Sequence, residues 1–90
     1  MAKLYKKGEG VYVLDVTGYT CPYPVIFTKK ALARIREGEV LEVIIDNPPS
    51  CETVPRAARE SGYSVEGPVS IGPGLWRITI KKGAGGGGYK

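Results

Sequence analysis

Two segments with alternating apolar residues, 11–16 and 40–46, are each followed by a segment whose apolar residues recur at helical spacing. A period of two is typical of a strand, and a spacing of three or four residues is typical of an amphipathic helix. In the segment 40–46, Leu41, Val43 and Ile45 point to one side of the predicted strand. This repeated order restricts the fold, because a strand–helix–strand unit places both strands in one sheet with the helix on its face.

The first helix is predicted to begin near residues 22–24 and to extend to residue 37. Pro24 suits the first turn, because its missing N–H would have no partner there. Gly38 stands where a left-handed C-terminal cap belongs. The apolar positions that indicate the helix are Val25, Ala31, Leu32 and Ile35.

A second helix is predicted over residues 52–61. Ser50 or Thr53 is expected to cap its N-terminus, Pro55 to lie in its first turn, and Gly62 to end it. Two strands follow in the prediction.

These last strands are predicted at 63–67 and 75–82, joined by a turn-rich segment, with Trp76, Ile78 and Ile80 facing inward. The order β-α-β-α-β-β favours an α+β two-layer sandwich, with both helices on one face of a mixed four-stranded sheet. We expect a single domain over 11–82, an N-terminal extension over 1–10 and a disordered glycine-rich tail over 83–90.

The composition excludes several classes of catalytic site. Ninety residues, 42% hydrophobic and 24% charged, suffice for one small core. The absence of histidine excludes a Cys/His dyad, a Ser/His/Asp triad and most zinc and haem sites. Two cysteines are too few for a secreted disulfide scaffold. We therefore expect no metal and no tightly bound cofactor.

The termini and the hydropathy give an expectation of location. No stretch approaches the roughly 20 apolar residues of a membrane span, and the N-terminal lysines are not followed by the apolar segment of a signal peptide. We expect a cytoplasmic protein with reduced thiols and no membrane contact.

Positive charge gathers in the first part of the chain. Residues 1–36 hold seven cationic and two anionic side chains, whereas the remaining residues hold six and seven. A basic region of this kind suits an acidic protein, a nucleic acid or a small anion, and it is also typical of a solvated surface. The cations predicted on the outer side of the first helix are Lys29, Lys30, Arg34 and Arg36.

Cys21 is the candidate reactive group. It falls between the first strand and the first helix, where unpaired N–H groups and the helix dipole are expected to lower the pKa of its thiol. Pro22 restricts the backbone beside the sulfur, and Pro24 fixes the start of the helix. Such a thiolate attacks a disulfide or persulfide without a general base. The competing interpretation is a small buried cysteine that serves only packing.

The string around this cysteine resembles a known signature. Residues 14–24 read LDVTGYTCPYP, which is similar to the L-D-x-x-G-x-x-C-P-x-P motif of the TusA (SirA-like) family of sulfur carriers and agrees at every fixed position. The resemblance continues through both predicted helices and the closing strands, over about residues 11–82. A bare C-P-x-P would be weakly specific, whereas the whole string in this order of elements is strongly specific.

The resemblance implies a fold like that of the C-terminal domain of translation initiation factor three, with a persulfide carried on Cys21. A cysteine desulfurase or a rhodanese-like protein would supply the sulfur, and an acceptor protein would receive it for tRNA thiolation, molybdenum cofactor synthesis or sulfur oxidation. This describes a relay protein of the sulfurtransferase type rather than a stand-alone turnover enzyme. Asp15 is expected to tie the loop by hydrogen bonds, and Gly18 to supply a positive φ.

Cys51 is open to three interpretations. It packs the second helix, it resolves the Cys21 persulfide by forming a disulfide, or it binds metal. If the first two predicted strands pair in parallel, their loops leave the same edge of the sheet. Cys21 and Cys51 could then reach each other after modest loop movement. Two thiolates without histidine make an incomplete zinc site.

Two alternatives to a carrier remain at this point. A basic, non-enzymatic RNA- or protein-binding module fits the charge, but the aromatic residues predict no stacking platform and no RNA motif is present, which disfavours nucleic acid. A Cys21/Cys51 thiol-redox protein is the other, although C-P-Y-P lacks the second cysteine of C-x-x-C. We expect a monomer that docks protein partners beside Cys21 through the basic helix.

Overall fold

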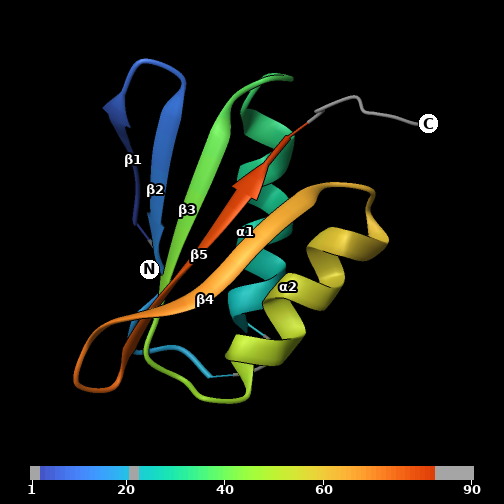
Figure 1. Ribbon diagram of the computed structural model, residues 1–90. Helices are drawn as coiled ribbons and strands as arrows, with labels where there is room; N and C mark the ends of the chain where they lie inside the picture. The colour runs from blue at the N-terminus through green and yellow to red at the C-terminus, as the bar shows by residue number, and fades with distance from the viewer. Residues whose placement is uncertain (1–2, 21–22, 83–90) are drawn as a thin grey trace.

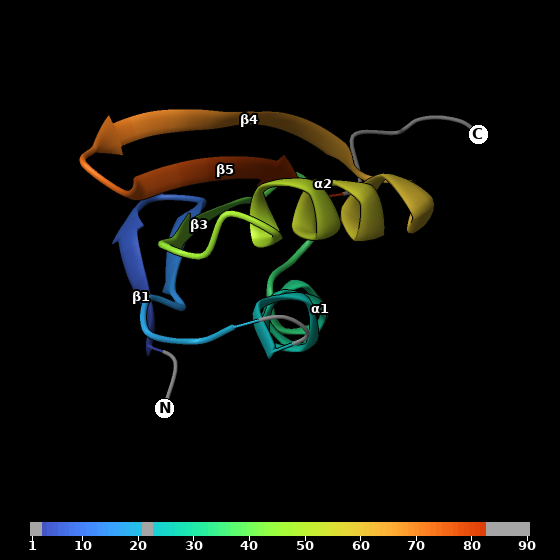
Figure 2. The ribbon, with the colours of Figure 1, turned by 90° about the horizontal axis from the view of Figure 1, so that it is seen from below.

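The computed structural model describes residues 3–20 and 23–82, which form a mixed sheet with two helices on one face (Figures 1 and 2). The strands lie in the order β1-β2-β3-β5-β4 across the sheet. The predicted two-layer α+β architecture is confirmed. The elements along the chain are β1 (Lys3–Gly8), β2 (Val11–Asp15), α1 (Tyr23–Arg34), β3 (Val40–Ile45), α2 (Ser50–Glu60), β4 (Ser64–Gly72) and β5 (Leu75–Lys81).

Strand pairing follows the predicted crossover. β2 and β3 are parallel and are connected through α1, whereas β1 pairs with β2, and β5 with β3 and β4, in antiparallel fashion. A parallel pair needs such a long connection, because a tight turn reverses the chain direction. The C-terminal ends of β2 and β3 therefore meet at one edge of the sheet.

The sheet has five strands rather than the predicted four. Residues 3–8, which we expected in an extension outside the domain, form the edge strand β1. A turn with Gly10 at a φ of 75° returns the chain into β2, and Leu4 pairs with Leu14 across the two strands. The sequence does not indicate this strand, because half of its residues are exposed lysines and it lacks the apolar alternation of a core strand.

Strand β4 is longer than predicted. It extends to Gly72 and includes Pro68, and its pairing with β5 shifts register between Glu66 and Val69. A proline is compatible with an edge strand at such a bulge, because no ladder hydrogen bond is required of it. The turn itself is confined to the residues around Gly74, whose φ is 70°.

Helix α1 ends earlier than predicted. Its last residue is Arg34, and Gly38, although at a φ of 89°, donates its N–H to the carbonyl oxygen of Lys82 at 2.7 Å instead of capping the helix. The Lys82 ammonium donates to the carbonyl oxygens of Leu32 and Ile35 at the end of α1. A cation just beyond the end of β5 thus satisfies helix carbonyls for which the sequence predicted a glycine cap.

Helix α2 begins earlier than predicted, at Ser50. Pro49 is the N-cap residue and no side chain caps the helix, so neither Ser50 nor Thr53 has the predicted role. The Ser50 hydroxyl instead donates to Asn47 Oδ1 at 3.1 Å. Pro55 consequently lies beyond the first turn, where its ring leaves the Cys51 carbonyl without the usual helical donor.

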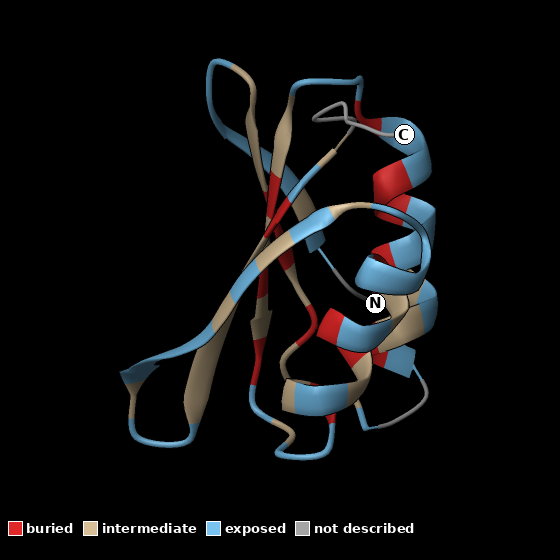
Figure 3. Cartoon of the chain, turned by 45° about the vertical axis from the view of Figure 1, so that its right-hand side comes forward, coloured by how far each residue is buried: buried red, intermediate tan, exposed pale blue. Residues whose placement is uncertain are grey.

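The core lies between the sheet and the two helices (Figure 3). Leu41, Val43 and Ile45 of β3 are fully buried, as the alternation predicted. In β5, Ile78 and Ile80 are also fully buried, and Trp76 packs against the core. The helices contribute Ala31, Leu32, Val54 and Ala58.

Candidate functional site

The ends of β2 and β3 support two loops that leave the same edge of the sheet. Asp15 pairs with Ile44, and the N–H of Val16 donates to the carbonyl oxygen of Ile44 at 3.0 Å. The first loop leads to α1 and contains Cys21; the second leads to α2, where Cys51 is in the first turn. Cys21 and Pro22 lie outside the described residues, which include the segments on either side of them.

Asp15 ties the start of the first loop. Its Oδ1 accepts hydrogen bonds from the N–H of Thr17 at 3.0 Å and from the Thr17 hydroxyl at 2.7 Å. Both bonds lower the pKa of Asp15, and the bond from the Thr17 hydroxyl has the larger effect. Burial raises this pKa and the positive charge of Lys3 lowers it, and the net shift is downward. The carboxylate therefore holds a local turn in its charged form.

Gly18 connects the first loop to the end of β3. Its φ is 87°, in the left-handed region that favours glycine. Its N–H donates to both carboxylate oxygens of Asp46, at 3.1 and 3.0 Å. We did not identify Asp46 as a site residue from the sequence; an acidic residue at the end of a strand parallel to β2 was the available signal.

Three aromatic rings gather at the start of α1, a grouping that the sequence analysis missed. Tyr19 meets Phe27 edge to face at 4.9 Å between ring centroids, and Tyr23 lies 6.4 Å from each of them. Tyr23 is 53% exposed, whereas Tyr19 and Phe27 are half-buried. The rings pack mainly on one another, so they tie the loop to the helix.

Pro24 is buried in the first turn of α1, where its lack of an N–H removes no helical bond. The N–H of Tyr23 donates to the carbonyl oxygen of Thr20 at 2.9 Å. This bond joins the end of the loop to the first residue of the helix. Pro24 and this contact fix the helix start that follows Cys21 in the sequence.

Cys51 is half-buried and packs against the core. Burial raises the pKa of its thiol, with a smaller opposing effect of a backbone hydrogen bond. The thiol is thus held mainly in its protonated form at neutral pH, which is typical of a packing cysteine rather than a nucleophile.

The four cations predicted for partner docking are all exposed. Lys29, Lys30 and Arg34 lie on α1, and Arg36 follows its end, with its backbone N–H bonded to Glu39. None of the four takes part in the ion pairs found among residues 3–20 and 23–82. Their charges are therefore available to a partner or to solvent.

No group of three acidic or cysteine side chains suited to a metal ion occurs within the described part of the chain. Among the same residues, no helix is both long and apolar enough to cross a membrane.

Comparison with known proteins decides the family. The family described as "Sulfurtransferase TusA" matches residues 12–82. The chain belongs to the TusA family. The whole signature over residues 14–24 lies within the matched region, as do both helices and the strands from β2 to β5 apart from Val11, the first residue of β2.

Relatives of this TusA-family chain carry related names. A "Putative sulfur carrier protein" of Methanocaldococcus jannaschii is 54% identical over 69 residues, which are 77% of this chain and 91% of the relative. The protein with that name from Thermotoga maritima is 44% identical over 68 residues, 76% of this chain and 86% of the relative. The crystal structure of a SirA-like protein from Desulfitobacterium hafniense superposes with a TM-score of 0.65 at 35% identity, covering 78% of this chain and 93% of the other.

Proposed function

We propose that this protein is a sulfur carrier that accepts sulfane sulfur as a persulfide on Cys21 and passes it to an acceptor protein. The observation that carries the proposal is the complete signature over residues 14–24, in a chain whose family and named relatives are sulfurtransferases and sulfur carriers. The described residues around Cys21 supply a tied loop and a fixed helix start, as a reactive cysteine requires.

The proposed transfer is a thiol exchange. The Cys21 thiolate attacks the outer sulfur of a persulfide on the donor, such as a cysteine desulfurase or a rhodanese-like protein. A new S–S bond forms on Cys21, the donor's S–S bond breaks, and the donor cysteine leaves as a thiolate that takes up a proton. The donor persulfide is reduced to a thiol while Cys21 is oxidised to a persulfide, so no external oxidant is needed.

The start of α1 favours this chemistry. Cys21 precedes the helix in the sequence, and the unpaired N–H groups of a helix N-terminus stabilise an anionic sulfur. In this proposal Asp15, Gly18, Pro22 and Pro24 shape the site, and no residue acts as a general base. The protein relays sulfur between partners and requires no cofactor of its own.

Charged residues of α1 are proposed to dock the sulfur donor or acceptor. Lys29, Lys30, Arg34 and Arg36 are exposed along and just after the helix that Cys21 precedes. Complementary charge accelerates short-lived encounters between proteins, as a relay requires. We place this relay in the cytoplasm, where thiols stay reduced, and expect the carrier to act as a monomer.

Cys51 is proposed to serve packing. Its contact with the core and the burial that raises the pKa of its thiol both oppose a role as resolving nucleophile. A resolving thiol would be expected to be more exposed and more acidic.

The test is the intact mass after incubation with a cysteine desulfurase and cysteine. Wild type and Cys51→Ser should gain one sulfur atom that a reductant removes, and Cys21→Ser should gain none. A loss of two hydrogens that requires both cysteines would instead support the resolving role of Cys51. An absence of adduct with both desulfurase and rhodanese donors would overturn the carrier proposal.

The docking proposal is tested by replacing Lys29, Lys30, Arg34 and Arg36 together with glutamine. Sulfur loading or delivery should slow, and the effect should shrink at high salt because screening weakens steering. Unchanged transfer rates with a collapse of RNA affinity would favour the nucleic-acid-binding alternative.

A further inference from the structure

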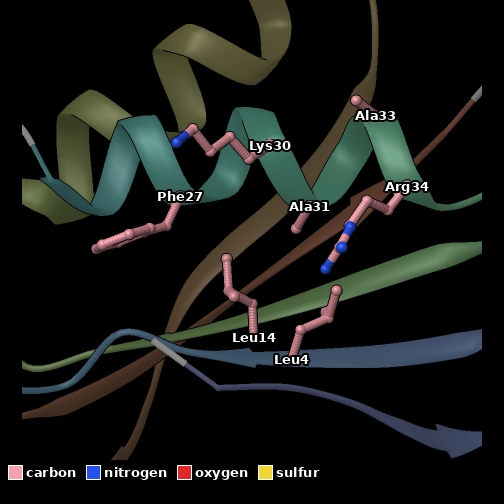
Figure 4. Close-up of a pocket in the computed structure, with 7 residues that line it drawn as sticks. All are labelled: Leu4, Leu14, Phe27, Lys30, Ala31, Ala33 and Arg34. Atoms are coloured by element: carbon pink, nitrogen blue, oxygen red, sulfur yellow. The ribbon is translucent and has the colours of Figure 1, made fainter. Parts of the chain in front are cut away.

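A pocket of about 490 Å³ lies between α1 and the strands β1 and β2 (Figure 4). Its floor is apolar. Figure 4 shows Leu4 and Leu14 pointing from the strands toward α1, and Ala31 pointing back from the helix. The complete lining consists of Leu4, Leu14, Phe27, Lys30, Ala31, Ala33 and Arg34.

The pocket exists because α1 does not cover the edge of the sheet formed by β1 and β2. α1 packs on α2 and β3, whereas β1 adds a further strand on the opposite side of β2. Leu4 and Leu14 are cross-strand partners; Leu14 is buried, and Leu4 remains half-buried. An apolar pair is thus left partly uncovered beside the helix.

The charge at this pocket has one sign. Lys30 and Arg34 are one helical turn apart, and no carboxylate belongs to the lining. Figure 4 shows the Arg34 guanidinium directed into the space between α1 and the strands, whereas the Lys30 ammonium points away from the strands. The ion pairs among the described residues include neither side chain. Arg34 therefore offers its donors above an apolar floor.

We propose that this pocket binds a small apolar carboxylate, such as a medium-chain fatty acid or an arylalkanoic acid. The apolar body would cover Leu4, Leu14 and Ala31, and the carboxylate would receive hydrogen bonds from Arg34. The planar guanidinium matches a carboxylate with two parallel N–H donors, which an ammonium group does not. Pockets for small molecules are mostly apolar with few polar groups and commonly span about 300–1,000 Å³.

Size favours a small molecule over a protein segment as the occupant. A specific protein interface buries roughly 800 Å² on each partner. The lining here is seven residues from one helix and two strands, with one guanidinium directed inward. Phe27, which lines the pocket, also contacts Tyr19 of the loop that leads to Cys21. Binding of a ligand in the pocket should therefore be detectable at that loop.

The experiment is a titration with decanoate, followed through the methyl NMR signals of Leu4, Leu14 and Ala31. Saturable shifts of these signals are expected. Arg34→Gln should weaken binding roughly tenfold, because it removes the charged donors. Lys29→Gln is the matched control; it removes the same charge from the same helix but not from the pocket lining, so affinity should change less than about twofold.

Two further measurements separate the expected result from other causes. Leu4 is half-buried and points from β1 into the pocket (Figure 4), so Leu4→Trp should fill the pocket and abolish the shifts of Leu14 and Ala31. Decanol should bind wild type more weakly than decanoate, and Arg34→Gln should remove that preference. Equal losses in the Arg34→Gln and Lys29→Gln variants, equal binding of decanol, or shifts confined to other residues would overturn the proposal. Binding of an acidic apolar peptide but not of decanoate would overturn it in favour of a protein partner.

Discussion

The backbone N–H of Gly18 donates to both carboxylate oxygens of Asp46, which stands 28 residues away at the end of the neighbouring parallel strand. The loop that leads to Cys21 is therefore held by a residue from the loop that leads to Cys51. The φ of Gly18 at this contact is 87°, in the left-handed region that glycine adopts without strain.

Removing this acceptor should loosen the loop. Asp46→Ala is expected to speed hydrogen exchange of the Gly18 amide, to cost about 1 kcal/mol of folding free energy and to slow sulfur loading of Cys21. Asp46→Asn retains one oxygen acceptor and should show a smaller effect on all three quantities. If the alanine and asparagine variants behave alike, or the exchange of Gly18 is unchanged, the bond does not hold the loop.

The left-handed conformation of Gly18 leads to a second prediction, which concerns folding stability. Gly18→Ala should destabilise the protein by about 1 to 2 kcal/mol, because a side chain strains the backbone at this φ. Apart from the two adjoining residues, no atom lies within 4 Å of the added Cβ, so overlap with the rest of the structure contributes nothing. Gly8→Ala is the matched control, since its Cβ also meets no atom and its φ is outside this region. Urea unfolding of the two variants measures the difference, and equal stabilities would refute the assignment to backbone strain.

The fold was largely predictable because its core strands are strongly patterned. Leu41, Val43 and Ile45 alternate without interruption, and the parallel pairing of β2 with β3 follows from the helix between them. Strand β1 was missed because Leu4 is its single inward apolar residue that packs against the core. The early end of α1 was missed because the donor that satisfies its carbonyls, Lys82, comes from the far end of the chain.

The candidate site was predictable only where its contacts are local. The hydrogen bond that the Thr17 hydroxyl donates to Asp15 spans two residues, so a turn motif in the sequence indicates it. Asp46 and the cluster around Phe27 depend on which elements the fold brings together. The pocket beside Arg34 also required β1, which the sequence did not reveal.

We expect the folding stability to depend on pH in the acid range because of the Asp15 carboxylate. Its pKa is lowered in the folded state, so its contribution to stability is present above the unfolded pKa of about 4 and is lost as the pH falls through the folded value. Asp15→Asn should therefore be about 1 kcal/mol less stable than wild type at pH 7, and the difference should vanish in strong acid. Urea midpoints across this range test the prediction.

Thr17→Val should raise the pKa of Asp15 toward its ordinary value, because the Thr17 hydroxyl is the main cause of the shift. An NMR titration of Asp15 that is unchanged in this variant would contradict that cause.

The contact of Lys82 with the end of α1 predicts a role in stability. Lys82→Met should cost about 1 to 2 kcal/mol, because the Leu32 and Ile35 carbonyls lose a charged donor at the negative end of the helix dipole. The melting temperature should fall by roughly 4–8 °C for each kcal/mol in a domain of this size. Lys81→Met is the control, since Lys81 is exposed. Equal melting temperatures for the two variants would exclude a capping role for Lys82.

The half-buried thiol of Cys51 gives a prediction that separates packing from nucleophilic chemistry. In a Cys21→Ser background, alkylation by iodoacetamide should be slower than that of a small free thiol. Its rate should rise with an inflection at a higher pH than that of a small free thiol, because burial raises the pKa of Cys51. The raised pKa of Cys51 also makes the folding stability depend on pH. The contribution of the protonated thiol is complete below the unfolded pKa and is lost as the pH rises through the folded value, so wild type should lose stability relative to Cys51→Ala in alkali. An inflection below that of a small free thiol would contradict the packing role and restore Cys51 as a candidate resolving thiol.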